Sequence, residues 1–419
     1  MKVLWFANTP CGAIEKICEA YYGGGWLKSL EESLVVNTQI ELNVCFYWNS
    51  PLLPFKYKQT NYFPIYRNSS NSKIVRHVKK YFPKLNDKDE IPLLLQVVNS
   101  VKPEVIHIHG TEDNFGLIQE FIEIPCVISI QGFLLPIVAK YYDGISKTIS
   151  NYYETLSTKL KYTPISILHK DLLKRSIREQ KILLKSKYII GRTSWDKRIS
   201  KLLAPNSKYY VGNEILRPVF YEKHWKKINF EGTIDIITVM SGPLYKGLET
   251  VVQVAGLLLS NKSVDFRWQV IGVNENHPVA KIVKRWLHIR YADLNIELVG
   301  NKNEEELSEL LVNADIYCQC SHIENSSNSL CEAMIVGMPI IASFAGGTDS
   351  MLEKDKEGLL IQTGDYYSFA GAIKSLVDHP EKAIAYGRNA RKTALLRHNV
   401  NSIVKELIAV YETIKKNEK

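Results

Sequence analysis

The sequence contains little that would build a disulfide framework, a zinc site or a membrane span. Its seven cysteines include no CxxC pair, and an odd, scattered set is typical of reduced thiols in the cytoplasm. The nearest approach to an apolar span, residues 124–139, is interrupted by two prolines and by Gln131-Gly132, whereas a membrane-spanning helix needs roughly 18 or more apolar residues. The N-terminal segment MKVLWFANTP predicts a first strand and no signal peptide. We therefore expect a cytoplasmic protein.

Charge alone does not select one class of ligand. The chain has 53 Lys and Arg against 44 Asp and Glu, a formal net charge of +9, which suits nucleic acid, an anionic membrane surface or phosphorylated small molecules. Basic residues are densest from Lys170 to Lys201. This segment is either a solvated helix face or a patch for acidic lipid headgroups or a lipid-linked diphosphate. Peripheral contact at the inner face of the cytoplasmic membrane is therefore one expectation.

Length and patterning predict an α/β protein of two domains. A chain of 419 residues exceeds one ordinary core, and apolar strand patterns alternate with helical ones, as in parallel sheets. We expect a first Rossmann-like domain over 1–205, a hinge over 206–232 and a second Rossmann-like domain over 233–400. Within the first domain, residues 49–64, with three prolines, predict a loop, and residues 113–122 predict a helix. Two such domains with parallel sheets would place an interdomain cleft at the carboxyl ends of their strands.

The stretch from Cys318 to Thr348 carries the strongest functional signal. An apolar run over 314–320 is followed by a polar loop over 321–328, a short helical pattern over 330–336 and a second strand that leads into Gly346-Gly347. This order predicts a helix N-terminus between two strand exits, where free N–H groups and the helix dipole favour an anion such as a diphosphate. A structural alternative is a capping box, in which Ser329 caps the helix and Glu332 is its partner.

The second half of the chain resembles the retaining nucleotide-sugar glycosyltransferases of family 4, which have the GT-B fold of two facing Rossmann-like domains. The resemblance rests on Lys246-Gly247 ahead of a helix, on Glu324 and Glu332 as an E-x7-E motif within ENSSNSLCEAM, and on MPIIAS followed by the glycine pair. The segments PEVIHIHG, YIIGRTSWD and NEILRPVFY are similar to members that build bacterial surface polysaccharides. We judge that the resemblance to this family covers roughly the whole chain.

The resemblance implies roles for individual residues. Glu324 would accept hydrogen bonds from donor-sugar hydroxyls, Glu332 would bind the ribose, and Lys246 would bind the diphosphate. Glu324 and Lys246 are thus the expected catalytic residues. The remaining expected donor-binding residues are Gly242 and the loop and first helical turn formed by Asn325, Ser326, Ser327, Asn328, Ser329 and Leu330. The last segment, 401–419, is implied to be a helix that crosses back to the N-terminal domain.

Two departures from the family concern the phosphate and the sugar. Many members carry an Arg shortly before the Lys, but this chain has Met240 to Pro243 there, so Arg192, Arg217 or another cation would have to replace it. Gln131 stands where many members have a His. Gly24, Gly25, His109, Gln131 and Arg192 are the expected acceptor or cleft residues. His107 and His109 alone are too few for a metal site, so we expect no metal and no cofactor beyond the nucleotide-sugar co-substrate.

The expected protein is a metal-independent, retaining hexosyl- or N-acetylhexosaminyltransferase. It would move a sugar from a UDP- or GDP-sugar to a glycan, lipid-linked or not, in capsule, exopolysaccharide or O-antigen synthesis. Alternatives are a sugar-nucleotide epimerase on the same fold, a non-catalytic sugar-nucleotide-binding protein, and a glycoside hydrolase that uses Glu324 and Glu332. A nucleic-acid-binding protein is disfavoured because the tyrosines near the basic residues show no regular spacing.

Overall fold

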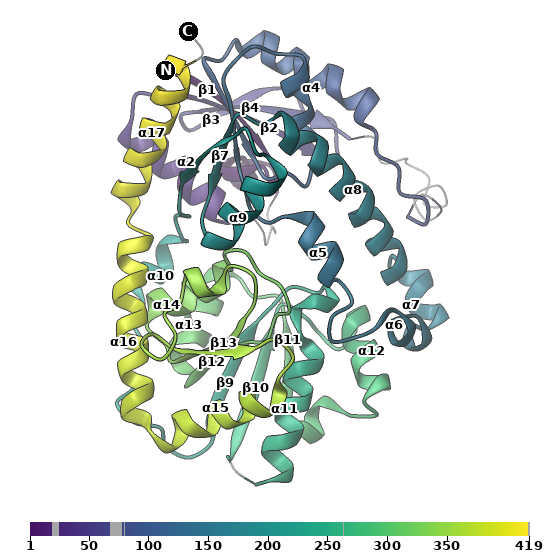
Figure 1. Ribbon diagram of the computed structural model, residues 1–419, viewed down its shortest axis with the longest axis vertical. Coiled ribbons are helices and arrows are strands. Elements are labelled where there is room, and N and C mark those ends of the chain that lie inside the picture. The colour runs from purple at the N-terminus through teal and green to yellow at the C-terminus, as the bar shows by residue number, and fades with distance from the viewer. Residues whose placement is uncertain (19–24, 68–77, 79, 263, 418–419) are drawn as a thin grey trace. The chain divides into compact units, whose positions relative to one another are not determined.

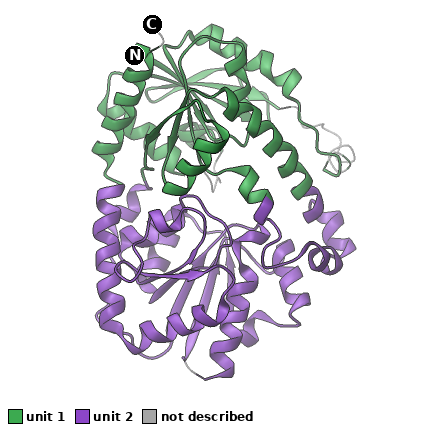
Figure 2. Cartoon of the chain, in the orientation of Figure 1, with its two compact units in different colours: residues 1–138, 169–215, 398–419 green, residues 139–168, 216–397 purple. Residues whose placement is uncertain are grey.

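The computed structural model describes residues 1–18, 25–67, 78, 80–262 and 264–417. The chain forms two compact units (Figure 2). Unit 1 comprises residues 1–138, 169–215 and 398–419, and unit 2 comprises residues 139–168 and 216–397. The α/β fold class is therefore confirmed, but the expected boundaries need correction. Residues 139–168 belong to unit 2, and the change of unit falls between Ile215 and Leu216, inside the expected hinge.

Unit 1 is built on an eight-stranded sheet with the order β3-β4-β2-β1-β5-β6-β7-β8. All neighbours pair in parallel except β3 and β4. The strands are β1 (Lys2–Ala7), β2 (Glu41–Trp48), β3 (Phe55–Tyr57), β4 (Thr60–Tyr66), β5 (Val105–His109), β6 (Cys126–Ser129), β7 (Tyr188–Gly191) and β8 (Lys208–Val211). Strands β1 and β5 are buried along nearly their whole length, as expected for a parallel sheet covered on both faces.

The helices of unit 1 cover this sheet (Figure 1). They are α1 (Ile14–Ile17), α2 (Gly25–Asn37), α4 (Asp87–Val101), α5 (Leu134–Lys140), α8 (Ile165–Lys185), α9 (Ser194–Leu203) and α17 (Val400–Asn417), with the 3₁₀ helices η1 (Cys11–Ala13) and η2 (Phe115–Glu120). Helix α17 packs here although it ends the chain. Tyr411 Oη contacts Trp5 Nε1 at 2.9 Å and His107 Nδ1 at 2.6 Å. The last helix is thus part of the unit 1 core.

Unit 2 is built on a six-stranded parallel sheet with the order β11-β10-β9-β12-β13-β14. Its strands are β9 (Ile234–Val239), β10 (Phe266–Ile271), β11 (Ile296–Gly300), β12 (Ile316–Gln319), β13 (Ile340–Phe344) and β14 (Leu359–Gln362). The strand order reverses between β9 and β12. In doubly wound folds the loops that leave the sheet at this switch point form the ligand site.

The helices of unit 2 come from before, between and after these strands in sequence. They are α6 (Lys147–Tyr153), α7 (Leu156–Lys161), α10 (Pro218–Glu222), α11 (Leu248–Ser260), α12 (Pro278–Trp286), α13 (Glu304–Asn313), α14 (Asn328–Val336), α15 (Tyr366–Asp378) and α16 (Pro380–Arg397), with η3 (Leu244–Lys246), η4 (Tyr291–Leu294) and η5 (Thr348–Ser350). Helix α14 is buried from Leu330 to Val336. The segment that bears the E-x7-E motif is therefore a core element of the unit.

Some sequence expectations were wrong in detail. Residues 49–64 were expected to be a loop, but they contain β3 and most of β4, with Pro64 inside the latter strand. The expected helix over 113–122 is the 3₁₀ helix η2. Asp87 and Asp89, in the segment Asp87-Lys88-Asp89, lie in the first turn of α4, and Asp87 pairs there with Arg178 at 2.8 Å. These differences arise where tertiary packing outweighs local propensity.

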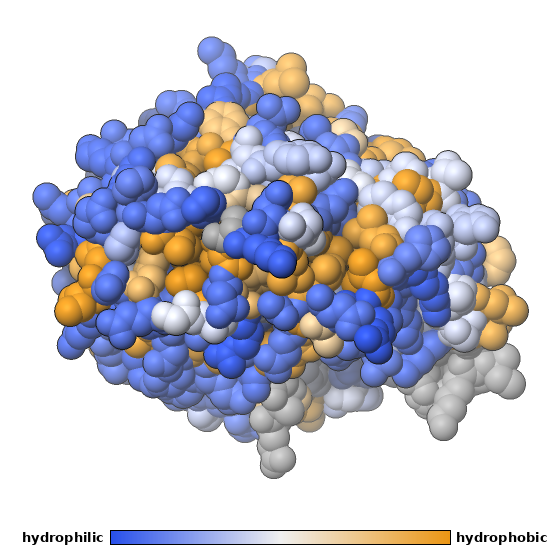
Figure 3. Space-filling view, turned by 90° about the horizontal axis from the view of Figure 1, so that it is seen from below, coloured by the Kyte–Doolittle hydropathy of each residue, from blue (hydrophilic) through white to orange (hydrophobic). Residues whose placement is uncertain are grey.

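Within the described residues, no helix is both long and apolar enough to cross a membrane. The face shown in Figure 3 is mostly hydrophilic, with hydrophobic residues in a band across its middle. Scattered exposed apolar residues are ordinary for folded proteins, whereas gathered ones indicate a contact surface.

Candidate functional site

Two loops leave the sheet of unit 2 at its switch point. The loop after β9 contains Gly242 and ends in η3 with Lys246, and the loop after β12 contains Glu324. A Cβ atom added to Gly242 would come within 2.2 Å of the His277 ring, so the first loop packs closely against the start of α12. These are the carboxyl ends of two neighbouring strands, where the sequence predicted the donor site.

Lys246 and Glu324 form an ion pair across these loops. Lys246 Nζ lies 2.6 Å from Glu324 Oε1, and Ser321 Oγ donates to the same oxygen at 2.8 Å. Burial by itself lowers the pKa of Lys246, but the charge and hydrogen bond of Glu324, together with Tyr245, outweigh burial and raise the pKa above the ordinary value. Lys246 is therefore a fixed cation at neutral pH.

Glycines let the flanking loops approach each other closely. Gly247, with φ +79°, lies over the carbonyl of Cys320, and an added Cβ would stand 2.0 Å from that oxygen. Gly346, with φ +57°, lies over the carbonyl of Glu324 in the same way, at 1.9 Å. Gly347 N also donates to Glu324 O at 3.0 Å. The glycine pair after β13 thus holds the backbone of Glu324 in place.

The N-terminus of α14 differs from the expected capping box. The N-cap is Ser327, which makes no capping hydrogen bond with its side chain. Ser329 instead accepts from Tyr317 Oη at 3.0 Å. The first i→i−4 hydrogen bond of the helix runs from Cys331 N to Ser327 O. The backbone N–H groups of the first turn therefore have no acceptor within the helix. The capping-box alternative for Ser329 and Glu332 is therefore wrong, and anion binding at this helix end stays a prediction.

The donor-site segment over 325–330 is only partly exposed. Asn325 is buried, Ser326 to Ser329 are half-buried, and Leu330 lies in the core, where it can offer a ligand only its backbone. The Asn328 Oδ1 atom is buried and has no hydrogen-bond partner among the described residues. It marks an acceptor that a ligand could satisfy.

Glu332 is held by Arg217. The Arg217 Nε and Nη2 atoms lie 2.9 and 2.8 Å from Glu332 Oε1, and the guanidinium lies over the Phe220 ring at 4.7 Å. Burial raises the pKa of Glu332, while the charge and hydrogen bonds of Arg217 lower it, and the raising effect dominates. Arg217, one candidate for the missing phosphate-binding cation, is thus placed beside the expected ribose-binding carboxylate.

A second ionisable pair, His322 with Glu249, adjoins the site. The sequence analysis assigned a role to neither residue. His322 Nε2 lies 2.6 Å from Glu249 Oε1, and His322 N donates to Tyr245 O at 2.8 Å. Gly144 fits over this pair, because an added Cβ would stand 2.1 Å from Glu249 and 2.4 Å from the imidazole. The pair connects the loop of Glu324 to the loop of Lys246 and to α11. The sequence signal that could have indicated Glu249 is its position as a carboxylate in the first helical turn after Lys246-Gly247.

In unit 1, four of the five expected acceptor or cleft residues are described, and Gly24 lies outside the described residues. His109, at the end of β5, has its ring 4.5 Å from that of Trp5 and 6.0 Å from that of Trp26. The Arg192 guanidinium lies 4.3 Å from the Trp26 ring, and Gly25 begins the helix that carries Trp26. His109, Arg192 and the start of α2 are therefore gathered at one edge of the sheet.

His109 is a buried imidazole with neither ring nitrogen hydrogen-bonded within the described part of the chain. Burial, together with the neighbouring His107 and Arg192, holds the pKa of His109 well below its ordinary value. The ring is therefore neutral at physiological pH. A neutral imidazole can donate one hydrogen bond and accept another.

Acid and base groups that the sequence analysis did not predict as a set gather at this edge of unit 1. A Cβ atom added to Gly110 would lie 2.0 Å from Glu112 Oε2 and 3.4 Å from Gln131 Nε2. Glu179, on α8, accepts from Thr111 Oγ1 and from Leu134 N. Burial raises the pKa of Glu112, and it raises the pKa of Glu179 to about 7 despite these donors. Only folding brings Glu179 to this edge.

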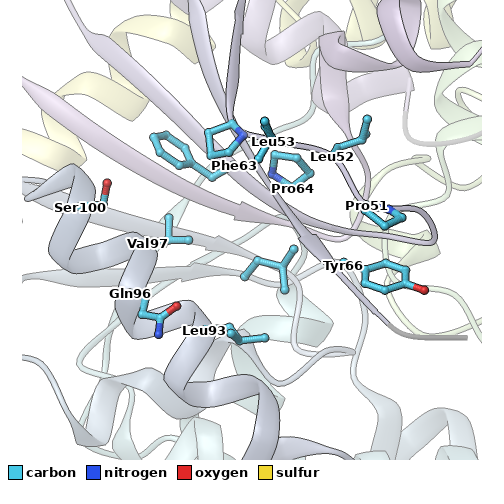
Figure 4. Close-up of a pocket in the computed structure, with 12 residues that line it drawn as sticks. Pro51, Leu52, Leu53, Phe63, Pro64, Tyr66, Leu93, Gln96, Val97 and Ser100 are labelled. Atoms are coloured by element: carbon cyan, nitrogen blue, oxygen red, sulfur yellow. The ribbon is translucent and has the colours of Figure 1, made fainter.

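An apolar pocket of about 510 Å³ lies on unit 1, where the sequence predicted only a loop (Figure 4). One wall is formed by Leu93, Gln96, Val97 and Ser100 of α4. The opposite wall comes from β4 and the preceding loop, namely Pro51, Leu52, Leu53, Pro54, Phe63, Pro64, Ile65 and Tyr66. The pocket is separate from the strand exits that carry His109 and Glu112.

Comparison with known proteins gives a match in unit 2. Residues 220–393 match the family model described as "Glycosyl transferases group 1", and this range includes Lys246, Glu324 and Glu332. Among curated relatives, an MMP alpha-(1->4)-mannosyltransferase of Mycolicibacterium hassiacum is 27% identical over 179 residues, covering 42% of each chain. A putative colanic acid biosynthesis glycosyltransferase of Escherichia coli is 24% identical over 231 residues, covering 52% of this chain and 55% of the relative. The chain thus spans about half the length of the curated relatives it matches.

Solved structures resemble the whole chain. Sucrose-phosphate synthase from Thermosynechococcus elongatus superposes with a TM-score of 0.74 at 13% identity, covering 99% of this chain and 98% of that one. The Anabaena protein HepE, solved in complex with UDP-glucose, gives a TM-score of 0.63 at 14% identity, covering 99% and 100%. At such low identity these likenesses establish the GT-B fold and no more.

Proposed function

We propose that the protein is a retaining glycosyltransferase that moves a hexosyl or N-acetylhexosaminyl group from a UDP- or GDP-sugar to a hydroxyl of a lipid-linked glycan. The observation that carries this proposal is the charged edge of the unit 2 sheet. There a half-buried Lys246–Glu324 pair and the N-terminus of α14 lie at the switch point of a region that matches the glycosyl transferases group 1 model. Relatives named for colanic acid and amylovoran biosynthesis support a role in surface-polysaccharide assembly.

In this proposal the residues of unit 2 bind the donor and stabilise its leaving group. The Lys246 ammonium and the free N–H groups of α14 would neutralise the charge that develops on the departing diphosphate, without a metal. Glu324 would then exchange its contact with Lys246 for hydrogen bonds to sugar hydroxyls, and Glu332 would receive the ribose. The leaving phosphate would take the acceptor's proton on the face from which it departs, which retains the anomeric configuration.

The donor site is tested by thermal unfolding with UDP, GDP, UDP-sugars and GDP-sugars. A ligand at about 100 times its Kd adds about 2.7 kcal/mol of stability. One nucleotide class should raise the midpoint of the wild type, and Lys246→Ala and Glu332→Ala should abolish this shift. Each variant is compared with its own ligand-free midpoint, because removing Lys246 leaves Glu324 unpaired.

The matched control is Lys223→Ala, which likewise removes the lysine from a Lys–Glu pair, here a surface pair with Glu309 in the same unit. This variant should keep the full ligand shift. If no nucleotide stabilises the wild type, or if the control loses as much as Lys246→Ala, the assignment of the site is wrong. Retention is tested separately by the anomeric coupling of the product in NMR, and metal independence by activity in EDTA.

A second candidate, a sugar-nucleotide epimerase, is supported by Glu112, Glu179 and His109, which lie at the same edge of unit 1. These groups could move a proton on a bound sugar, which donor binding alone would not require. The two functions separate when the donor is incubated without acceptor and followed by NMR. An epimerised nucleotide-sugar would favour this candidate, and an unchanged donor favours the transferase.

A further inference from the structure

Helix α8 presents an exposed face that its own unit leaves uncovered. Along this 21-residue helix, Leu173, Ile177 and Leu184 are 42%, 52% and 63% exposed. At 3.6 residues per turn these three positions follow one another along the helix axis in a single row. Burying three large aliphatic side chains normally contributes to stability, so a folded protein that leaves them in water has a surface suited to another apolar phase.

A second row, of lysines, runs beside the apolar one. The exposed residues Lys170, Lys174, Lys181 and Lys185 fall, together with the apolar row, within an arc of about 120° of the helix. The two acidic residues of α8 do not face this arc. Asp171 is half-buried beside Arg175, at 3.7 Å, and Glu179 is fully buried. The exposed arc is therefore purely apolar and positive.

The chain before α4 extends this surface. Lys174 Nζ donates to Pro83 O at 2.7 Å, which brings the neighbouring Phe82, 68% exposed, next to the two rows. The nearest acidic group of α4, Asp87, is already paired with Arg178 of α8. We name this surface, formed by Phe82, Leu173, Ile177, Leu184 and the four lysines, the α8 face. Helix α8, which carries most of these residues, lies along the edge of unit 1 (Figures 1 and 2).

We propose that the α8 face binds the surface of an anionic phospholipid bilayer, with its apolar row among the acyl-chain boundary and its lysines among the headgroups. A helix that lies in the interface needs an apolar face beside a basic one, and each lysine near an anionic surface adds to binding. An acidic protein would match the lysines but would not need an exposed row of large aliphatic residues with a phenylalanine. The proposal deepens the proposed function, since it would hold unit 1 where a lipid-linked acceptor is found, but its test does not depend on catalysis.

The test is flotation of the full-length protein with vesicles of phosphatidylcholine alone or with about one third phosphatidylglycerol, at low and high salt. The wild type should bind the anionic vesicles, bind the neutral ones weakly and lose affinity with salt. Lys181→Gln should weaken binding about fivefold. The double variant Ile177→Gln with Lys181→Gln should weaken it tenfold or more, because it also removes an inserted side chain.

The matched control is Lys392→Gln with Leu396→Gln, which changes an exposed lysine and an exposed leucine four residues apart on α16 of unit 2. It should bind vesicles like the wild type. The proposal is overturned if the wild type ignores anionic vesicles at low salt, or if the control weakens binding as much as the α8 variant. It is also overturned if Ile177→Gln alone has no effect while soluble polyglutamate competes fully with the vesicles, a result that would indicate an acidic protein partner. Nucleotide binding by unit 2 should be unchanged in all these variants, so this proposal and the proposed function fail separately.

Discussion

The carboxyl edges of the two sheets are chemically different although their topologies are alike. In both sheets the strand order reverses beside the first strand of the unit, between β1 and β5 in unit 1 and between β9 and β12 in unit 2. The edge of unit 2 presents ion pairs, Lys246 with Glu324 and Arg217 with Glu332. The edge of unit 1 presents His109, Glu112 and Glu179, groups whose neutral forms are favoured by burial.

This difference indicates what each edge can bind. A fixed cation beside a helix N-terminus suits a ligand that is always charged, such as a diphosphate. A neutral imidazole, beside carboxyl groups whose pKa is raised by burial, suits hydroxyls, which need hydrogen bonds of both directions. The same sheet topology thus supports an electrostatic site in one unit and a hydrogen-bonding site in the other, because side chains and not the backbone order decide the chemistry.

The largest expected effect is a loss of stability in unit 1 but not in unit 2. Deletion of residues 400–419 removes α17, which contributes six buried apolar side chains to unit 1: Ile403, Val404, Leu407, Val410, Tyr411 and Ile414. At about 1.5 kcal/mol each, their loss is about 9 kcal/mol, similar to the whole stability of a typical domain. Hydrogen exchange should show lost protection in β1 and β5 and retained protection in β9 and β12. Equal loss in both sheets would contradict the assignment of α17 to unit 1 alone.

A smaller effect is expected from the glycine that supports Glu324. Gly346→Ala places a Cβ at positive φ against the Glu324 carbonyl, and we expect a loss of about 3 kcal/mol from backbone strain and overlap. Gly256→Ala, in α11 with no atom within 4 Å of its added Cβ, should instead gain about 0.5–1 kcal/mol. Urea unfolding measures both. A neutral Gly346→Ala would show that the loop can move away and does not fix Glu324.

The pH dependence of stability tests the neutral character of the unit 1 edge. His109 stays neutral in the folded state, whereas in the unfolded chain it takes up a proton below its ordinary pKa of 6.5. The unfolded state therefore binds more protons than the folded state below pH 6.5. As the pH is lowered from 6.5, the free energy of unfolding decreases by up to about 1.4 kcal/mol per pH unit. His109→Gln should lose this contribution, so the variant should gain about 2 kcal/mol relative to the wild type between pH 6.5 and 5. His379→Gln, at an exposed position, is the control, and parallel pH profiles for His109→Gln and the wild type would contradict the prediction.

The smallest effect concerns the pair that connects the loops of Lys246 and Glu324. Glu249→Gln keeps an oxygen acceptor for His322 but removes its charge, which should weaken the contact by about 1.4 kcal/mol, or tenfold. We expect the nucleotide shift in thermal unfolding to persist, while kcat falls about tenfold with little change in the KM of the donor. A loss of nucleotide binding with unchanged kcat would show that Glu249 serves the fold of the site and not the position of Glu324.

Much of the site was predictable because its signals are local. The order strand, polar loop, helix and glycine pair around Glu324 follows from apolar patterning and turn residues within about thirty positions of sequence. The same local reasoning also offered the capping box of Ser329 and Glu332 as an alternative, since S-x-x-E is the capping-box pattern, and the structure contradicts that alternative. The true partner of Glu332 is Arg217, 115 residues away, and no local pattern contains that contact.

The expected loop over residues 49–64 was wrong for a related reason. Its prolines argue against a central strand, yet β4 pairs in parallel with β2 over six residue pairs, Pro64 among them. The neighbouring strand, and not the segment's own propensity, decides its conformation here.

The sequence by itself determined the alternation of strands and helices, and with it two parallel sheets, because the period of apolar residues is a local property of the chain. It also determined the candidate residues Lys246, Glu324 and Glu332. Only the tertiary structure decided that residues 139–168 belong to unit 2 and that Glu112, Glu179 and His109 meet at one sheet edge. These facts depend on contacts between distant segments, and such contacts are chosen by the burial of whole surfaces, which no window of sequence contains.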